Sequence, residues 1–148
     1  MITSCGFLIQ SLDKYLLCHS THPKKTAKRY DGRWGISKGG QEKNETFLET
    51  AKRETIEEIG LDVDSFDFKI SKNYYSYVYK SKKKRLFIYK VLDVKGLLVD
   101  FPFHCDSMVD NEYREIDSFT WVDDKEIKDI IMTSQRPIID IEEDYWRF

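Results

Sequence analysis

The segment that most constrains the fold is a single helix whose start and end are both marked in the sequence. Thr46 and Glu49 have the spacing of a capping box, in which the hydroxyl and the carboxylate each satisfy a backbone N–H group at the start of a helix. Gly60 can adopt the left-handed conformation that ends a helix, and Leu61 supplies the apolar contact that often follows it. The sequence therefore predicts a helix over residues 47–59.

Acidic side chains crowd one side of this predicted helix. Glu54, Glu57 and Glu58 have i, i+3 and i+4 spacing, which places them on neighbouring turns of one surface. They lie beside the stripe that would pack on the core, which consists of Leu48, Ala51, Thr55 and Ile59. Carboxylates this close together either raise some of their pKa values or bind cations. The arrangement favours a cation-binding cleft, and the alternative interpretation is a solvated surface helix.

The same segment resembles the Nudix box, the signature of the Nudix hydrolase family. The fixed positions of the signature are matched by Gly39, Glu45, Arg53, Glu54, Glu57, Glu58, Gly60 and Leu61. Thr55 stands where the signature has an aliphatic residue, and its methyl group can still pack. Residues 34–40 (WGISKGG) are similar to the lead-in common in the family, with Ser37 in place of the usual proline. We expect that change to loosen the loop and to touch no metal ligand.

The resemblance implies Mg²⁺-dependent hydrolysis of a pyrophosphate linkage in a nucleoside diphosphate derivative, with Mn²⁺ as a substitute ion. A divalent cation neutralises the negative oxygens around the phosphorus that water attacks. The implied principal metal ligands are Glu54 and Glu58, with Glu57 and the carbonyl oxygen of Gly39 completing the set. Arg53 is implied to serve catalysis as an organiser, bracing the loop against the helix together with Glu45 and pairing with Glu57.

A further acidic position follows from a resemblance in the C-terminal part of the chain. Residues 115–122 (EIDSFTWV) look like a segment of dinucleoside polyphosphate and RNA 5′-pyrophosphohydrolases, in which an acidic residue begins a strand that ends in Trp-Val. This resemblance implies Glu115 as an additional metal ligand or as the general base, and Glu112 is its near rival. Glu54 and Glu115 both remain candidates for the base that takes a proton from the attacking water.

Three further residues are candidate substrate contacts. Lys38 could reach a substrate phosphate, and Tyr77 and Tyr79 lie where dinucleoside polyphosphate hydrolases carry a tyrosine a short distance after the box. The alternative for the tyrosines is packing within a sheet, where aromatic stripes usually occur. The proline that marks many ADP-ribose hydrolases is missing, because no proline occurs between Pro23 and Pro102.

The favoured substrates are therefore a dinucleoside polyphosphate or the 5′ end of triphosphorylated RNA. ADP-ribose, nucleotide sugars and nucleoside triphosphates remain alternatives. A nucleotide-binding module that does not cut its ligand is a further alternative, but such modules commonly have degraded boxes, and here every acidic position is present.

The remaining periodicity predicts strands and short helices. Residues 2–10 and 14–20 form a predicted hairpin, and residues 75–79 form a predicted strand antiparallel to 86–92, with a basic turn over 80–85. Predicted helices over 123–131, capped by Asp123, and over 136–145, with Pro137 in the first turn, contribute packing only. The basic loop 21–34 either reaches substrate phosphates or is solvated. This order of elements predicts an α+β fold, an α/β/α sandwich with a mixed β-sheet, which the Nudix resemblance also implies.

Composition predicts one domain over residues 1–148. A hydrophobic content of 41% can supply a core, and a net charge of −2 gives no global attraction to nucleic acid or membrane. Three cysteines without CxxC spacing predict free thiols in a reducing compartment, with no disulfide framework and no zinc site. No apolar run is long enough to span a bilayer, so a cytoplasmic location is expected.

Overall fold

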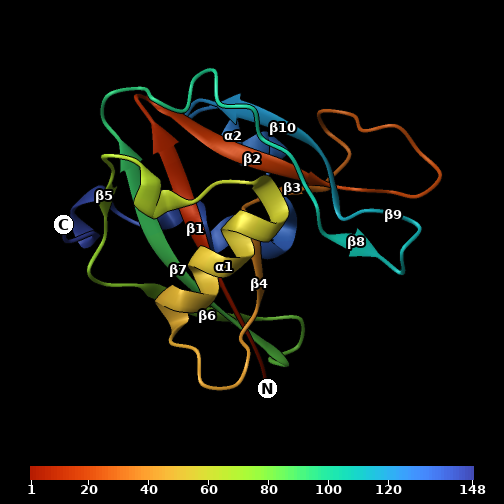
Figure 1. Ribbon diagram of the computed structural model, residues 1–148, viewed down its shortest axis with the longest axis horizontal. Helices are drawn as coiled ribbons and strands as arrows, with labels where there is room; N and C mark the ends of the chain where they lie inside the picture. Colours follow the sequence, from red (N-terminus) through yellow and green to blue (C-terminus); the bar gives the residue numbers. More distant parts are fainter.

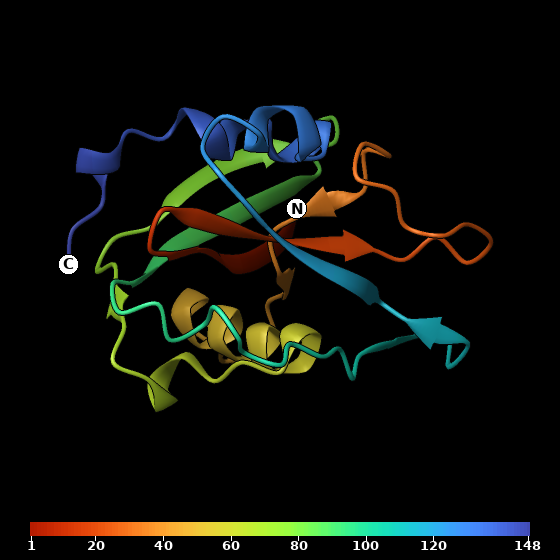
Figure 2. The same ribbon diagram turned by 90° about the horizontal axis from the view of Figure 1, so that it is seen from above.

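A computed structural model of the chain describes all 148 residues, which fold around one mixed β-sheet (Figure 1). Helix α1 (Phe47–Ile59) covers one face, and α2 (Ile127–Ile130) and the 3₁₀ helix η2 (Thr133–Asp140) cover the other (Figure 2). Two further 3₁₀ turns are η1 (Val63–Ser65) and η3 (Glu143–Tyr145). This layering confirms the predicted α/β/α sandwich.

The sheet is built around the first strand of the chain. The strands are β1 (Ile2–Ser11), β2 (Lys14–Ser20), β3 (Trp34–Gly35), β4 (Lys38–Gly40), β5 (Lys69–Ile70), β6 (Tyr75–Tyr79), β7 (Lys84–Asp93), β8 (Met108–Val109), β9 (Tyr113–Arg114) and β10 (Ile116–Val122). The main path runs β10-β2-β1-β7-β5, with β3 on β2, β4 on β1 and β6 on β7, while β8 and β9 form a separate ribbon. Strand β1 pairs with β7 in parallel along its whole length, and the other pairings are antiparallel. The predicted mixed sheet is confirmed.

One edge of β1 is shared by two strands. Because β7 occupies the other edge, β4 pairs with Ser4–Gly6 and β2 pairs only with Gln10–Ser11 at the far end. Strand β2 therefore diverges from β1, and β4 occupies the edge that it leaves, which makes a fork in the sheet. Residues 34–40, which contain β3, β4 and the two residues between them, lie at this fork.

The central strand is buried on both of its faces, as expected for a strand with helices on each side. Phe7 and Ile9 point into the cluster that packs under α1, which also contains Ala51 and Ile59. Leu8 points the opposite way, into a second cluster with Ile138 and Trp146 of the C-terminal segment. The core thus fixes which face of the sheet carries the Nudix-like helix.

Helix α1 has the predicted bounds. Thr46 Oγ1 accepts from the Glu49 backbone N–H at 3.1 Å, and the Glu49 carboxylate accepts from the Thr46 N–H at 3.1 Å. Gly60 ends the helix with φ 73°, and Leu61 is fully buried. Both signals are local in sequence, which explains why the prediction of this element succeeded.

Other predicted bounds need correction. The hairpin strands were predicted well, although β1 continues to Ser11. Strand β7 begins at Lys84 rather than at residue 86, because Lys84 and Arg85 pair with Tyr79 and Val78.

The three cysteines are free and buried, in agreement with the expectation of free thiols. None of the helices combines the length and the apolar composition needed to cross a membrane.

The predicted C-terminal helices over 123–131 and 136–145 were wrong in extent. Asp123 Oδ1 accepts from the N–H groups of Lys125 and Glu126, and this local bonding stabilises a turn, so regular helix begins only at Ile127. Pro137 lies inside η2, where it cannot donate to an α-helical ladder. The segment therefore packs as short 3₁₀ turns.

Candidate active site

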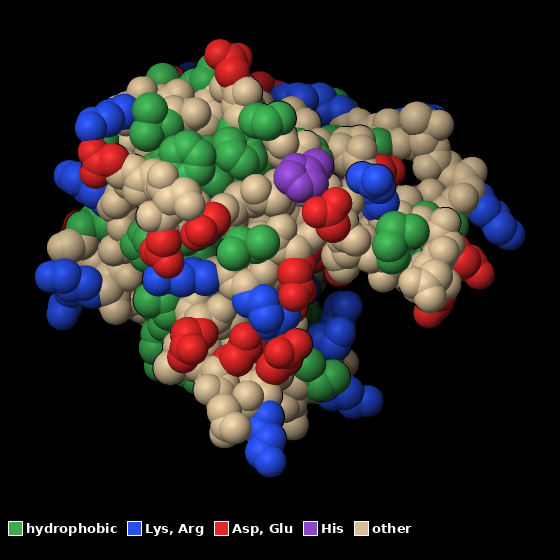
Figure 3. All heavy atoms as spheres, in the orientation of Figure 1, with side chains coloured by type: hydrophobic (Ala, Val, Ile, Leu, Met, Phe, Trp, Pro, Cys, Tyr) green, Lys and Arg blue, Asp and Glu red, His purple; other side chains and the backbone are tan.

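A cleft of about 200 Å³ lies at the fork of the sheet. Its walls include Glu58 of α1, Glu115 just before β10, Lys38 of β4, Lys80 beyond β6 and Gln135 of η2. Five segments that are distant in sequence therefore meet at one place. On the face shown in Figure 3, acidic side chains gather over α1 with basic side chains among them.

Glu58 is the most deeply buried acid of the cluster, with only 4% of its surface exposed. Its Oε1 atom accepts from Ser37 Oγ at 2.9 Å and from the Lys38 backbone N–H at 2.7 Å. Burial, helped by the charges of Glu115 and Glu54, raises the pKa of Glu58 to about 9, although the hydrogen bond from Ser37 opposes the shift. A cation beside this carboxylate would favour its ionised form.

Glu54 lies one helical turn from Glu58 and faces strand β4. A Cβ atom added to Gly39 would lie 2.0 Å from the Glu54 carboxyl carbon, so only glycine leaves room for this carboxylate. Arg53 Nη1 donates to Glu54 Oε1 at 2.9 Å. Burial raises the pKa of Glu54, while Arg53 opposes the shift and the charges of Glu57 and Glu115 add to it.

Arg53 ties the loop before α1 to the helix. Its Nε and Nη2 atoms donate to the two carboxylate oxygens of Glu45 at 2.7 and 3.0 Å, and Nη2 also donates to the carbonyl oxygen of Gly40 at 2.8 Å. The hydrogen bond from Arg53 lowers the pKa of Glu45 to about 2. The predicted bracing contact between Arg53 and Glu45 is thus present.

The other predicted acids occupy different environments. Glu57 has 49% of its side chain exposed and pairs with Arg53 Nη1 at 3.2 Å, as the i, i+4 spacing predicted. Glu115 accepts from Ser107 Oγ at 2.8 Å and faces the cleft. Its rival Glu112 is exposed in the turn between β8 and β9, so the structure brings Glu115, and not Glu112, to Glu58.

The three predicted substrate contacts lie in different environments. Lys38 and Lys80 both place their Nζ atoms over the ring of Tyr79, at 5.9 and 6.0 Å from its centre, and both line the cleft. Tyr77 lies on the same face of β6, but its hydroxyl donates to the Ser134 carbonyl oxygen at 2.9 Å and its burial raises its pKa. Both rings pack against the same core cluster, but only Tyr79 contacts the two lysines that line the cleft.

The expectation that Ser37 touches no metal ligand was wrong. Its hydroxyl donates to Glu58, and a proline at this position would have no group to donate. Ser37 is 3% exposed and fixes the loop that we expected it to loosen. The serine in place of the usual proline was the only sequence signal for this contact. The contact itself depends on how residues 34–40 fold against α1.

Gln135 was missed altogether. It is 2% exposed, and its Oε1 atom accepts from the Ile36 backbone N–H at 2.8 Å. Gly35 makes room for the amide, since an added Cβ would lie 2.6 Å from Gln135 Oε1. The bond joins positions 99 residues apart, and no local pattern marks it.

The basic loop after β2 is anchored away from the glutamates. His19 is fully buried, and its two ring nitrogens bond Asp31 of the loop at 2.7 Å and Asp117 of β10 at 2.6 Å. Lys24 and Lys28 remain exposed to solvent. Of the two interpretations of this loop, the solvated one agrees with this geometry.

The acids of the cleft fit a hard divalent cation. Three carboxylates, those of Glu54, Glu58 and Glu115, influence one another electrostatically, and Mg²⁺ prefers such oxygen ligands. No three His, Cys, Asp or Glu side chains are already gathered as a complete metal site. This is compatible with Mg²⁺, which takes one or two carboxylates and retains several waters.

Comparison with known proteins identifies the relatives of this chain. Residues 3–140 match the family model of the NUDIX domain. Among curated protein sequences, none matches the chain. Solved structures with the same fold include an Ap4A hydrolase from C. elegans in a binary complex (TM-score 0.64, 16% identity, 88% of this chain and 85% of that chain covered).

Two further structures show the same similarity. A MutT protein from Bacillus halodurans has a TM-score of 0.62 and 19% identity, with 95% of this chain and 81% of that chain covered. The dihydroneopterin triphosphate pyrophosphohydrolase of E. coli has a TM-score of 0.60 and 17% identity, with coverage of 93% and 92%. At these identities the structures establish the fold alone.

Proposed function

The chain belongs to the Nudix family of pyrophosphohydrolases, and from this premise we propose that it is a Mg²⁺-dependent hydrolase of dinucleoside polyphosphates or of 5′-triphosphorylated RNA. The observation that carries the proposal is the meeting of Glu58 and Glu115, from two distant segments, with Lys38 and Lys80 in one cleft, while Glu54 lies one helical turn from Glu58 and acts on its charge. Carboxylates that attract cations and lysines that attract phosphates are the two requirements of this chemistry.

Glu54 and Glu58 are the proposed principal ligands of the metal, with Glu57, Glu115 and the Gly39 carbonyl oxygen as further donors. When bound, Mg²⁺ would neutralise phosphate oxygens and make water more acidic, and Mn²⁺ would serve in its place. The hydrogen bonds to Glu58 Oε1 fix the orientation of that carboxylate.

The chain's own residues supply positioning and proton transfer. Glu54 or Glu115 accepts the proton of the attacking water, and both remain candidates because each faces the cluster with its carboxylate only partly bonded. Arg53 holds Glu54 and the loop before α1 in place through its hydrogen bonds, and Lys38 binds a phosphate of the substrate. These groups hold the reacting atoms in place, which is the main contribution of a protein to phosphoryl transfer.

The substrate preference rests on the basic residues of the cleft. Lys38 and Lys80 line the cleft and lie over the ring of the neighbouring Tyr79, which suits a ligand with several phosphates and a base. ADP-ribose, nucleotide sugars and nucleoside triphosphates offer fewer phosphates or different second groups and are the runners-up. A binding module without activity is disfavoured because every acid of the box is present.

A substrate panel in ¹⁸O-labelled water tests this proposal. The panel contains Ap4A, 5′-triphosphorylated RNA, ADP-ribose, a nucleotide sugar and nucleoside triphosphates, each with Mg²⁺, Mn²⁺ or EDTA. We expect hydrolysis of Ap4A or the RNA with either ion and none with EDTA, and mass spectrometry of the products identifies the phosphorus that was attacked. Faster hydrolysis of another class would overturn the substrate assignment, and no hydrolysis of any compound would overturn the enzyme assignment.

Mg²⁺ should also stabilise the folded protein by mass action. At an ion concentration about 100 times the dissociation constant, the gain is about 2.7 kcal/mol in the free energy of unfolding. Glu58→Gln should reduce the Mg²⁺-induced rise in melting temperature, because it removes one charged ligand. Equal rises in the wild type and in this variant would place the bound ions elsewhere.

The two neighbouring tyrosines provide a matched test of base stacking. Tyr79→Ala should raise KM by the equivalent of about 1–3 kcal/mol, with Tyr79→Phe close to wild type, because stacking needs only the ring. Tyr77→Ala should instead lower the melting temperature and leave KM unchanged, since its hydroxyl bonds Ser134 and the lysines of the cleft lie over Tyr79 rather than over its ring. An unchanged KM in Tyr79→Ala would rule out stacking on this residue.

A further inference from the structure

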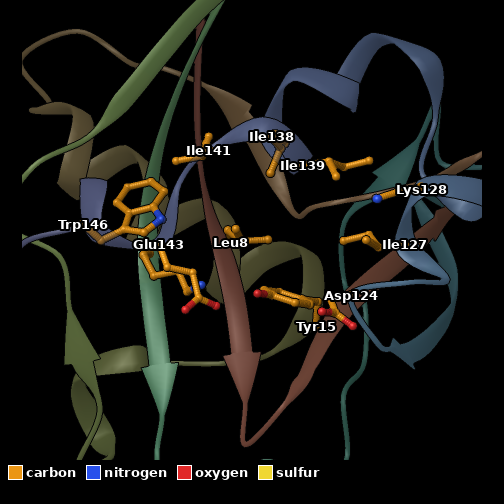
Figure 4. Close-up of a pocket in the computed structure, with 11 residues that line it drawn as sticks. Leu8, Tyr15, Asp124, Ile127, Lys128, Ile138, Ile139, Ile141, Glu143 and Trp146 are labelled. Atoms are coloured by element: carbon orange, nitrogen blue, oxygen red, sulfur yellow. The ribbon is translucent and has the colours of Figure 1, made fainter.

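A second cavity, of about 240 Å³, lies on the face of the sheet opposite to α1 (Figure 4). It is enclosed between the sheet and the C-terminal segment, and its labelled side chains converge from both sides. The apolar part of its wall consists of Leu8, Ile127, Ile138, Ile139, Ile141 and Trp146. None of these residues belongs to the glutamate cleft.

One buried charge interrupts this apolar wall. Lys90 of β7 lines the cavity and is only 5% exposed, yet it makes no ion pair and its ammonium group donates no hydrogen bond to the protein. The nearest compensation is the face of Tyr15, whose ring centre lies 5.0 Å from Lys90 Nζ. Burial lowers the pKa of Lys90 to about 8, and the charge of Glu143 opposes this shift.

The Lys90 side chain thus places a charge in a largely apolar pocket, where an apolar side chain would need no hydration. The exposed residues of the lining, Asp124, Lys128 and Glu143, mark the mouth of the cavity. Only the two acids among them could compensate the charge of Lys90, and solvent screens their charges. A ligand that enters the cavity would bring a negative charge to Lys90 and displace the solvent that reaches its ammonium group.

We propose that this cavity is a ligand-binding site, separate from the hydrolase cleft, for a small amphipathic carboxylate. Its carboxylate pairs with Lys90 Nζ, and its aliphatic part packs against the isoleucines and Trp146. The two acids at the mouth would repel a polyanion, so a nucleotide does not fit the electrostatics of this site. The cavity is also smaller than the 300–1,000 Å³ that is typical for larger ligands.

Isothermal titration with three probes of equal chain length tests this inference: octanoate, octanol and octylamine. We expect octanoate to bind one site, about tenfold or more tighter than octanol, with octylamine weakest. Lys90→Met should abolish the preference for octanoate over octanol while raising or preserving the melting temperature. Lys128→Met removes an exposed lysine at the mouth, and its affinity for octanoate should stay within about twofold of wild type.

The pH dependence separates pairing with Lys90 from simple hydrophobic binding. Octanoate affinity should be constant from about pH 6, where the probe is ionised, to the pKa of Lys90, about 8, and fall as the pH rises above it, because the ammonium loses its proton. Tyr15, Asp124, Lys128 and Glu143 also face the cavity, so the same titration of Lys90→Met shows how much of the fall they cause. Octanoate affinity should be the same in Glu54→Gln, whatever that variant does to hydrolysis.

Three results would overturn the inference. They are equal affinities for octanoate and octanol, an unchanged octanoate preference in Lys90→Met, and no binding of octanoate by the folded wild type. None of them depends on the substrate panel, so the two proposals fail independently.

Discussion

Glu58→Gln and Glu54→Gln should each lower kcat by about 10²–10³-fold at saturating Mg²⁺, while leaving the fold intact. Each change removes one charge that would hold the cation at the reacting phosphate, and the amide is nearly isosteric with the carboxylate. In Glu58→Gln, the carbonyl oxygen of the new amide could still accept from Ser37 Oγ and from the Lys38 N–H. Because burial already opposes the charge of Glu58, its neutral replacement should not lower the melting temperature.

Steady-state kinetics and thermal melts on these variants are best compared with Glu112→Gln. That residue is exposed in the β8–β9 turn and should show wild-type kcat. Glu115→Gln should be measured in the same series, because Glu115 is the other candidate for the general base. Near-normal turnover in both Glu54→Gln and Glu58→Gln would remove α1 from the active site.

Gly39→Ala should lower kcat by about 10²-fold without removing any functional group, because a displacement of about 1 Å is enough for such a loss. The new methyl carbon would lie 2.0–2.4 Å from the atoms of the Glu54 carboxylate, so either this carboxylate or β4 must move. Gly40→Ala is the matched control in the same strand, since nothing lies within 4 Å of its added Cβ. It should retain wild-type kcat.

The double variant Gly39→Ala/Glu54→Gln shows whether the loss acts through Glu54. If it does, the double variant should be no slower than Glu54→Gln alone, as expected for residues that act as a unit. Equal kcat values in Gly39→Ala and Gly40→Ala, or fully additive losses in the double variant, would contradict this explanation.

The sequence predicted those parts of the molecule whose causes are local. The capping box at Thr46 and the left-handed Gly60 fix α1 from within a few residues, and the spacing of the acids follows from that helix. The layered fold followed from the order of the elements and from the Nudix resemblance. At the C-terminus, the prediction used Asp123 as a helix cap and Pro137 as a first-turn residue, but Asp123 caps a turn and Pro137 lies inside a 3₁₀ helix.

The parts of the site that escaped prediction depend on contacts across the fold. Gln135 reaches Ile36 over 99 positions, and Ser37 gains its role only when its loop lies over Glu58. Tyr77 and Tyr79 look equivalent in sequence, but the C-terminal segment covers one and the lysines flank the other. Such differences depend on tertiary packing, which gives residues with the same sequence spacing different neighbours.

The parallel pairing of β1 with β7 has a consequence for the nascent chain on the ribosome. Ser11 at the end of β1 bonds Asp93 at the end of β7, across 82 positions. At about 5–20 residues per second, β7 is completed on the order of 10 s after β1. Until then β1 has only short pairings, with β2 at Gln10–Ser11 and with β4 at Ser4–Gly6. For that interval the emerging chain carries an apolar strand with an open edge, the kind of segment that chaperones bind and that misassembles when they do not.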